Sequence, residues 1–134
     1  MVRADWLSVS AAAACLLACG GSGGGASDAQ IQKGRDAAAT GALLFERNCQ
    51  SCHGEHGEGT DKGPAVLDKH RLGKRFKNAQ NLFDFIIKEM PKDNPGSLDI
   101  PQVWNIETFM VVASGRNLED RLSEGNAEDT KLDK

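Results

Sequence analysis

Two cysteines and a histidine within five residues are the part of this sequence best equipped for chemistry. Cys49, Cys52 and His53 form a Cys-x-x-Cys-His run, which is the attachment pattern of c-type haem. The two thiols would add to the two vinyl groups of the porphyrin, and the histidine that follows at once would ligate the iron. The spacing therefore predicts one covalent haem c and a function in electron transfer. It also predicts an extracytoplasmic protein, because this haem is attached outside the cytoplasm.

The same residues are compatible with two other kinds of site. A structural zinc ion needs four ligands, usually in two spaced pairs, and outside the motif only His56 and His70 lie nearby. A thioredoxin-like cysteine pair should open a helix after a β-strand. Residues 41–48 instead have the pattern of a helix that ends at the motif. Both alternatives are therefore less favoured than haem.

Length and charge restrict the classes of protein that this chain can belong to. The 134 residues are enough for one small domain with tails, and 16 Lys and Arg face 19 Asp and Glu, for a net charge of −3. This balance excludes a globally basic nucleic-acid binder, so we expect no nucleic-acid partner. A domain of this size buries a modest core, to which a haem would add a large apolar surface.

The N-terminus has the pattern of an export signal. Residues 6–18 are apolar but shorter than the roughly 20 residues that span a bilayer, and their length suits the apolar region of a signal peptide. The Leu-Leu-Ala-Cys run at 16–19 resembles the lipobox of bacterial lipoproteins. This resemblance implies that Cys19 carries the lipid and that Cys15 leaves with the signal. An ordinary cleaved signal peptide, with Cys19 unmodified, is the alternative.

These patterns divide the chain into four parts. We expect a lipoprotein signal peptide over 1–18 and a haem domain over 34–118. Between them, lipidated Cys19 would begin a flexible tether over 19–33, which is rich in Gly and Ser. The charged residues 119–134 are poor in apolar side chains, so we expect a disordered tail there, with a solvated helical extension as the alternative.

The residues before the motif carry a resemblance to a known family. Gly41, Phe45 and Cys49 are spaced to share one helical face. The pattern Gly-x-x-x-Phe-x-x-x-Cys-x-x-Cys-His-Gly resembles the N-terminal helix of class I cytochromes c. The resemblance implies an all-α cytochrome c fold wrapped around one haem. The first and last helices of that fold cross almost perpendicularly, with Gly41 and Phe45 at the crossing and Phe109 against them.

The resemblance also suggests what lies on each side of the haem. The Gly-Pro-Ala-Val-Leu stretch at 63–67 resembles a family segment in which the proline carbonyl accepts a hydrogen bond from the axial histidine, which implies that role for Pro64. On the other side we expect Met90 as the second ligand. An amphipathic helix over 79–90 must stop there because Pro91 follows. The next segment is an irregular loop that could cover the open haem face.

Other residues could take the second ligand position. His56 and His70 would give bis-histidine haem with a lower potential, whereas His/Met ligation raises the potential. Met110 falls within a helix predicted over 101–114 and is expected in the core. The buried stripe of that helix should comprise Val103, Ile106, Phe109 or Met110, and Val112 or Ala113.

A haem iron whose two axial positions are both filled by protein ligands favours outer-sphere electron transfer through the haem edge. We expect redox-protein partners, a dehydrogenase as donor and an oxidase or reductase as acceptor, and a monomer or a complex subunit anchored to a bacterial membrane. The loop after Met90 resembles that of cytochromes associated with periplasmic dehydrogenases, including sulfur-oxidising ones, so a dedicated dehydrogenase subunit is an alternative. A haem-based sensor or peroxidase would require Met90 to be absent or labile.

A short basic stretch is the last candidate site. Six cationic residues without an acid between them could steer an acidic partner or could form a solvated surface. They are Lys69, His70, Arg71, Lys74, Arg75 and Lys77.

Overall fold

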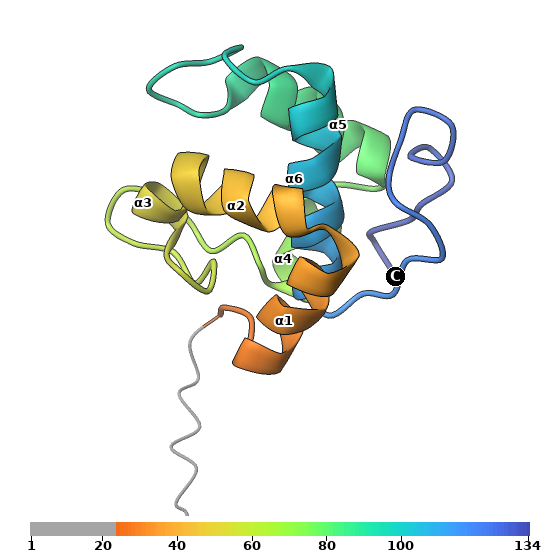
Figure 1. Ribbon diagram of the computed structural model, residues 1–134, viewed down its shortest axis with the longest axis horizontal. Helices are drawn as coiled ribbons and strands as arrows, with labels where there is room; N and C mark the ends of the chain where they lie inside the picture. Colours follow the sequence, from red (N-terminus) through yellow and green to blue (C-terminus); the bar gives the residue numbers. More distant parts are fainter. Residues whose placement is uncertain (1–23) are drawn as a thin grey trace, which may run out of the picture.

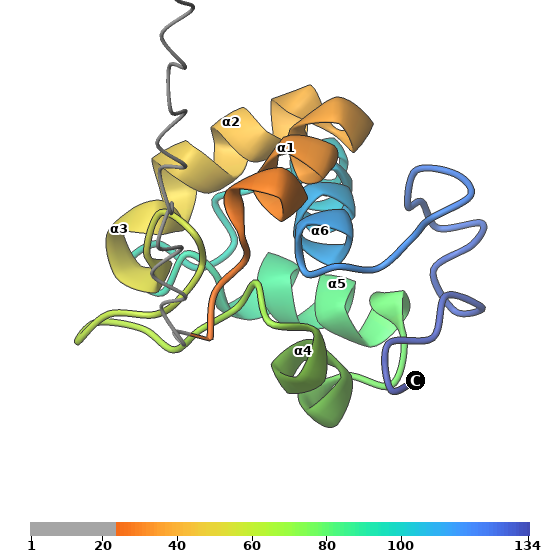
Figure 2. The same ribbon diagram turned by 90° about the horizontal axis from the view of Figure 1, so that it is seen from below.

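The computed structural model describes residues 24–134, and this part of the chain is all-α. Cys15, Cys19 and the predicted signal peptide lie outside the described residues. Figures 1 and 2 show helices packed around α6. Within residues 24–134 the only strand-like pairing is one isolated β-bridge, between Asn78 and Lys131. The helices are α1 (Asp28–Ala37), α2 (Ala39–Asn48), α3 (Gln50–His53), α4 (Lys69–Arg75), α5 (Ala79–Glu89) and α6 (Ile100–Ala113).

The two longest helices begin and end where local sequence signals predict. The side chain of Asn78 accepts a hydrogen bond from Asn81 at the start of α5, and Met90 ends that helix. Asp99 and Gln102 form a capping box at the start of α6. Gly115 follows the end of α6 with φ +94, a conformation that favours glycine. The predicted helices over 79–90 and 101–114 are confirmed to within one residue at each end.

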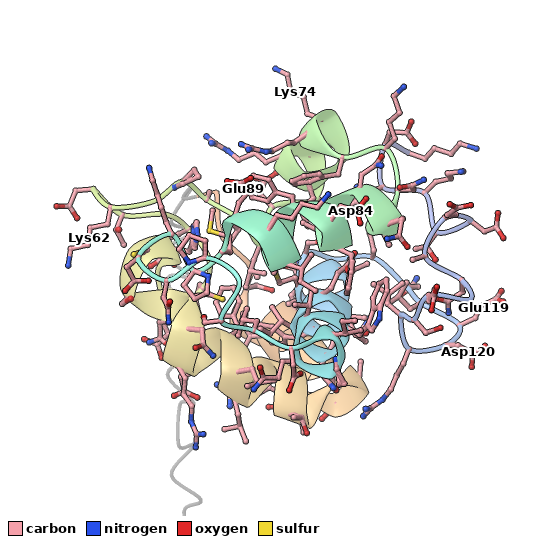
Figure 3. The ribbon with its side chains drawn as sticks, turned by 90° about the horizontal axis from the view of Figure 1, so that it is seen from above. Lys62, Lys74, Asp84, Glu89, Glu119 and Asp120 are labelled. Atoms are coloured by element: carbon pink, nitrogen blue, oxygen red, sulfur yellow. The ribbon has the colours of Figure 1, made fainter. Side chains whose placement is uncertain are left out.

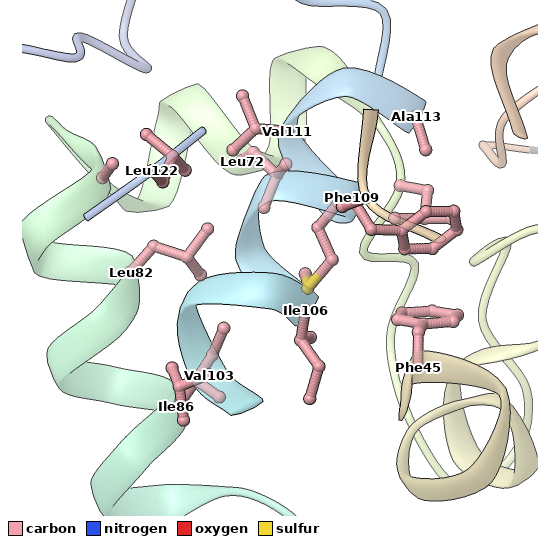
Figure 4. Close-up of a cluster of buried hydrophobic side chains, with 14 of the residues drawn as sticks. Phe45, Leu72, Leu82, Ile86, Val103, Ile106, Phe109, Val111, Ala113 and Leu122 are labelled. Atoms are coloured by element: carbon pink, nitrogen blue, oxygen red, sulfur yellow. The ribbon is translucent and has the colours of Figure 1, made fainter. Parts of the chain in front are cut away.

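The crossing of α2 and α6 has the predicted residues at its centre. A Cβ atom on Gly41 would overlap the carbonyl oxygen of Asn105, so only glycine allows the two backbones to approach this closely. The rings of Phe45 and Phe109 lie 5.3 Å apart between centroids, at 52°, which is the tilted arrangement that aromatic pairs prefer. Figure 4 shows this pair within the buried apolar cluster between α2, α5 and α6. The helix crossing predicted from the sequence is therefore confirmed.

The second half of the predicted tether is wrong, because α1 begins inside it. Ser27 and Gln30 form a capping box before α1, and Ile31 and Gly34 are buried. A Cβ on Gly34 would lie 2.8 Å from the ring of Phe109, so α1 packs tightly on α6. The polar composition of this segment concealed a narrow apolar face of two residues one turn apart.

The prediction of a disordered tail is also wrong, and so is its helical alternative. In Figure 1 the dark blue segment 118–134 folds back against the helices without forming a helix of its own. Leu122, Ala127 and Leu132 are buried. This C-terminal segment, residues 118–134, covers the side of α6 that the sequence pattern predicted to face solvent. Thr108 is buried there, and its hydroxyl accepts a hydrogen bond from the amide of Leu122, whereas Glu107 is buried near Asp84 of α5. The predicted stripe excluded both residues.

None of the helices within residues 24–134 is long and apolar enough to cross a membrane.

Candidate functional site

The Cys-x-x-Cys-His motif occupies the end of α2 and the single turn of α3. The amide of Cys49 donates to Phe45 (N···O 2.8 Å), which completes α2, and the amide of His53 donates to Cys49 (2.9 Å), which closes the turn. Gly54 then ends α3 with φ +86, where a side chain would be strained. The two thiols and the imidazole therefore lie within the single turn that joins α2 to α3.

The loop after the motif folds back onto it. The amide of Gly59 donates to the carbonyl of His53 (2.7 Å), and the hydroxyl of Thr60 donates to the carbonyl of Cys52 (2.6 Å). Both bonds satisfy backbone groups at the end of α3 that a short helix leaves unpaired. The contribution of Thr60 was not predicted, because an isolated threonine in a Gly-rich loop carries no recognisable signal.

One contact orients the histidine ring. The carbonyl oxygen of Pro64 lies 2.7 Å from Nδ1 of His53, and a carbonyl can only accept, so Nδ1 must carry the proton. Nε2 then has a free lone pair. A Cβ on Gly63 would lie 3.1 Å from the ring atoms Cε1 and Nδ1, so the backbone at 63–64 closely supports the ring. This hydrogen bond is the one that the family resemblance implies.

The two thiols are suited to attachment and poorly suited to redox cycling. Cys49 and Cys52 are both free cysteines. Burial, with a smaller contribution from the neighbouring Cys52, raises the pKa of the Cys49 thiol to about 12. Reactive dithiols depend on a lowered pKa, so a thioredoxin-like site is disfavoured. Zinc is disfavoured too, because within residues 24–134 no group of three or more His, Cys, Asp or Glu side chains could hold a metal ion.

Met90 directly follows α5 and is only partly buried against the core. The α5–α6 loop that it opens lies at the same end of the molecule as α3 in both views (Figures 1 and 2). The rival ligands lie elsewhere: Nε2 of His56 is 3.2 Å from a carboxylate oxygen of Asp28, and His70 is exposed on α4. Met110 is buried within α6.

Partly buried apolar side chains on α2, α5, α6 and the loops between helices could pack against a flat apolar cofactor. Several apolar residues pack only partly against the core, so each keeps a face that a cofactor could cover. Trp104 stacks on Phe83, with 3.9 Å between ring centroids, which fixes one of these faces in place. The partly buried residues on these helices and loops are Leu44, Cys49, Val66, Phe85, Ile87, Met90 and Trp104. With two free thiols and an oriented imidazole, the set fits haem c.

The fold and this donor set define a class I c-type cytochrome domain with covalent haem c. The chain belongs to the family described as cytochrome c oxidase, cbb3-type, subunit III, whose model matches residues 36–110. Its function is electron transfer, and its covalent haem places it outside the cytoplasm.

Two relatives are associated with sulfur chemistry. The chain is 29% identical over 101 residues to thiosulfate dehydrogenase of Stutzerimonas stutzeri (strain A1501), covering 70% of this chain and 33% of that protein. It is also similar to a chain in the crystal structure of the sulfane dehydrogenase SoxCD from Paracoccus pantotrophus, with 25% identity and a TM-score of 0.61. That match covers 75% of this chain and 58% of the other. The chain thus spans about a third of the first relative and somewhat over half of the second.

Proposed function

We propose that this domain carries one electron on a haem bound through Cys49 and Cys52, with His53 and Met90 as the axial ligands. The observation that carries the proposal is the 2.7 Å contact between His53 Nδ1 and the carbonyl of Pro64. It leaves Nε2 as the ligating atom, holds the ring, and raises the basicity of the ligand, as such outer contacts do in metal sites. When bound, the haem supplies a one-electron couple, and the protein supplies ligands and burial that tune its potential.

Met90 is the second ligand in this proposal because of its position in the fold and the exposure of its side chain. It lies where a rigid helix gives way to a loop, its thioether is only partly buried, and the competing His56 is paired with Asp28. Two axial ligands leave no open position for oxygen or peroxide. We therefore favour an electron carrier over a sensor or peroxidase.

The donor that we propose is a dehydrogenase that oxidises a sulfur compound. The support is that both relatives carry such activities in their names, thiosulfate dehydrogenase and sulfane dehydrogenase. This chain would serve either as a separate carrier or as the haem subunit of a dedicated complex. An oxidase or reductase would be the acceptor.

We also propose that the domain is anchored to a bacterial membrane through lipid on Cys19. The support is the lipobox-like run at 16–19 and the Gly-rich residues that follow it. A diacylated cysteine supplies more than one acyl chain, which is enough for a stable anchor.

Spectroscopy of the haem-loaded full chain tests the ligand assignment. The oxidised wild type should show a weak far-red sulfur-to-iron band, and Met90→Ala should lose this band and fall in potential. Met110→Leu is the matched control, because it changes a methionine that is buried in α6, and it should keep the band. A Met90→Ala variant that keeps the band would overturn the assignment. Binding of carbon monoxide by ferrous wild-type protein would favour the sensor or peroxidase alternative.

A further inference from the structure

Residues 24–26, which precede α1, already pack against the rest of the domain. The amide of Ala26 donates to the carbonyl of His56 (2.9 Å), and Ala26 is buried. A Cβ on Gly25 would lie 2.8 Å from that same carbonyl oxygen, so Gly25 lies directly against the loop that follows the haem motif. Any tether between Cys19 and the domain is therefore limited to residues 20–23. The composition had predicted a tether over 19–33.

This short connection limits how far the domain can stand from its lipid. Five residue steps separate Cys19 from Gly24, and a fully extended chain spans at most about 17 Å over five residues. Salt screens charges over roughly 8–10 Å at physiological ionic strength. The surface around Gly24 would thus be kept within about two screening lengths of the lipid headgroups.

The element next to this exit point is α4, the basic helix. A Cβ on Gly24 would lie 3.5 Å from the carboxylate of Asp68, which caps α4, and 4.0 Å from Nε of Arg71. All six cationic residues of the basic stretch are exposed. In Figure 3, Lys74 projects outward from α4, on a different side of the molecule from the acidic Glu119 and Asp120.

The positive charge of α4 is not neutralised by the surrounding protein. The one ion pair within residues 24–134 joins His56 to Asp28, so no carboxylate there pairs with a cation of α4. Asp68 is engaged in capping α4 through the amide of Arg71, and Glu58, which lies against Gly25, accepts a hydrogen bond from the amide of His56. The helix itself is held firmly, because Leu72 is buried and Arg116 donates to the carbonyl at the start of α4.

We propose that the exposed cationic face of α4 binds the anionic headgroups of the membrane that carries the anchor. The proposal rests on lipidation of Cys19, part of the proposed function. Charge complementarity and the short connection favour this occupant over an acidic protein, since the lipid surface is always within reach. The arrangement also orients the domain. In Figure 1 the start of the described chain lies near the bottom and the α5–α6 loop at the top, so the loop lies far from the point where the described chain begins.

Spin-label accessibility in vesicles tests this contact in the full, haem-loaded chain. Haem attachment and lipidation occupy the other cysteines of the processed chain, so His70→Cys introduces a single labelling site on α4 without removing a lysine or arginine. A nitroxide there should become severalfold less accessible to a water-soluble relaxation agent in vesicles containing phosphatidylglycerol than in pure phosphatidylcholine. A label at Lys92→Cys in the α5–α6 loop should be equally accessible in both.

Charge reversal supplies the matched control. Lys74→Glu with Lys77→Glu should restore accessibility at position 70, whereas Lys33→Glu with Lys88→Glu, which changes exposed lysines on α1 and α5, should not. Equal accessibility in both vesicles, with lipid found on Cys19 by mass spectrometry, overturns the α4 contact and leaves the anchor intact. An unmodified Cys19 overturns the anchor and the contact together. If α4 stays accessible but its reversal slows electron exchange with an acidic redox protein, the patch belongs to a protein partner.

Discussion

Residues 49–67, which carry the haem motif, and the C-terminal segment are both largely irregular, yet they are held in opposite ways. The bonds within 49–67 are local: Gly59 donates to His53, Thr60 to Cys52, and Pro64 accepts from His53. The C-terminal segment has local turns of its own, but bonds to distant residues, several about 50 positions away, fix it to the rest of the domain. The amide of Ala79 donates to Thr130 (2.9 Å). One region is thus organised by its own sequence and the other by the finished fold.

The C-terminal segment completes the start of α5. The first amides of a helix lack partners within it, and here Ala79 and Gln80 donate to the carbonyls of Thr130 and Ala127. The amide of Leu132 donates to Lys77 (2.9 Å), and Arg116 donates to the carbonyl of Leu132. None of these residues belongs to the haem site. The difference between the two regions therefore predicts that changes beneath the C-terminal segment alter stability, whereas changes in 49–67 alter the redox properties.

The largest effect should come from Glu107, which is buried on α6 near Asp84 of α5. Its carboxyl is fully buried without a hydrogen-bond partner, and burial, with a smaller contribution from Asp84, raises its pKa from 4.5 to about 9. The folded state holds a proton that the unfolded state releases. This contribution to stability is therefore fully present below pH 4.5 and is lost as the pH rises towards 9. At about 1.4 kcal/mol per pH unit, the loss is on the order of 3 kcal/mol by pH 7.

Urea unfolding at several pH values measures this effect against Glu107→Gln. The two proteins should differ least near pH 4.5 and should diverge as the pH rises, with the variant gaining relative to wild type. Glu124→Gln is the control, because Glu124 is an exposed acid of the C-terminal segment, and its curve should parallel the wild type. Parallel curves for wild type and Glu107→Gln would mean that Glu107 has a partner or solvent access in solution.

Leu132→Ala should give the next largest effect. Leu132 is fully buried near the end of the chain, and truncating such a side chain costs about 2–3 kcal/mol, at the lower end of the range for core leucines. The haem spectrum and the potential should stay unchanged, because the segment does not touch the motif. Leu43→Ala is the control, since Leu43 is 51% exposed, and it should be nearly neutral. A changed spectrum in Leu132→Ala would show that α5 transmits strain from the C-terminal segment to Met90.

The difference between local and long-range contacts also explains which parts of the molecule could be predicted from the sequence. The haem motif was predictable from its spacing, and the family resemblance implied the contact of His53 with Pro64 and the crossing at Gly41 and Phe45. The boundaries of α5 were predictable because Asn78 and Pro91 act on their immediate neighbours. The position of Met90 after α5 was predicted on the same basis, and its ligand role stays a prediction.

The errors arose where distant segments decide the outcome. The polar character of residues 28–33 and 119–134 suggested disorder, since local composition does not show that α6 offers an apolar surface on several sides. A single leucine such as Leu132 carries no periodicity, yet it is fully buried once α4 and α5 are in place. The burial of Thr108 was missed for the same reason, because the residue that covers it, Leu122, lies in the C-terminal segment, which the sequence assigned to solvent.

The smallest effect on stability should come from Gly63→Ala. This variant also tests most directly whether residues 49–67, unlike the C-terminal segment, control the redox properties. The added Cβ would lie 2.8 Å from the carbonyl of Cys52 and 3.1 Å from the ring of His53, so the ring must turn slightly away from Pro64. Such overpacking costs about 1 kcal/mol. A weaker hydrogen bond makes the histidine a poorer donor to iron, which favours the reduced state and raises the potential.

The size of the redox change is bounded by the hydrogen bond itself. A bond worth about 1 kcal/mol corresponds to roughly 40 mV for one electron, so the rise should not exceed that value. Protein-film voltammetry can resolve such a shift. Gly125→Ala is the matched control: it lies in the C-terminal segment, and its nearest neighbour would be 3.8 Å from the new Cβ. An unchanged potential in Gly63→Ala, with normal stability, would show that the ring tolerates the shift and that Pro64 positions the histidine without tuning it.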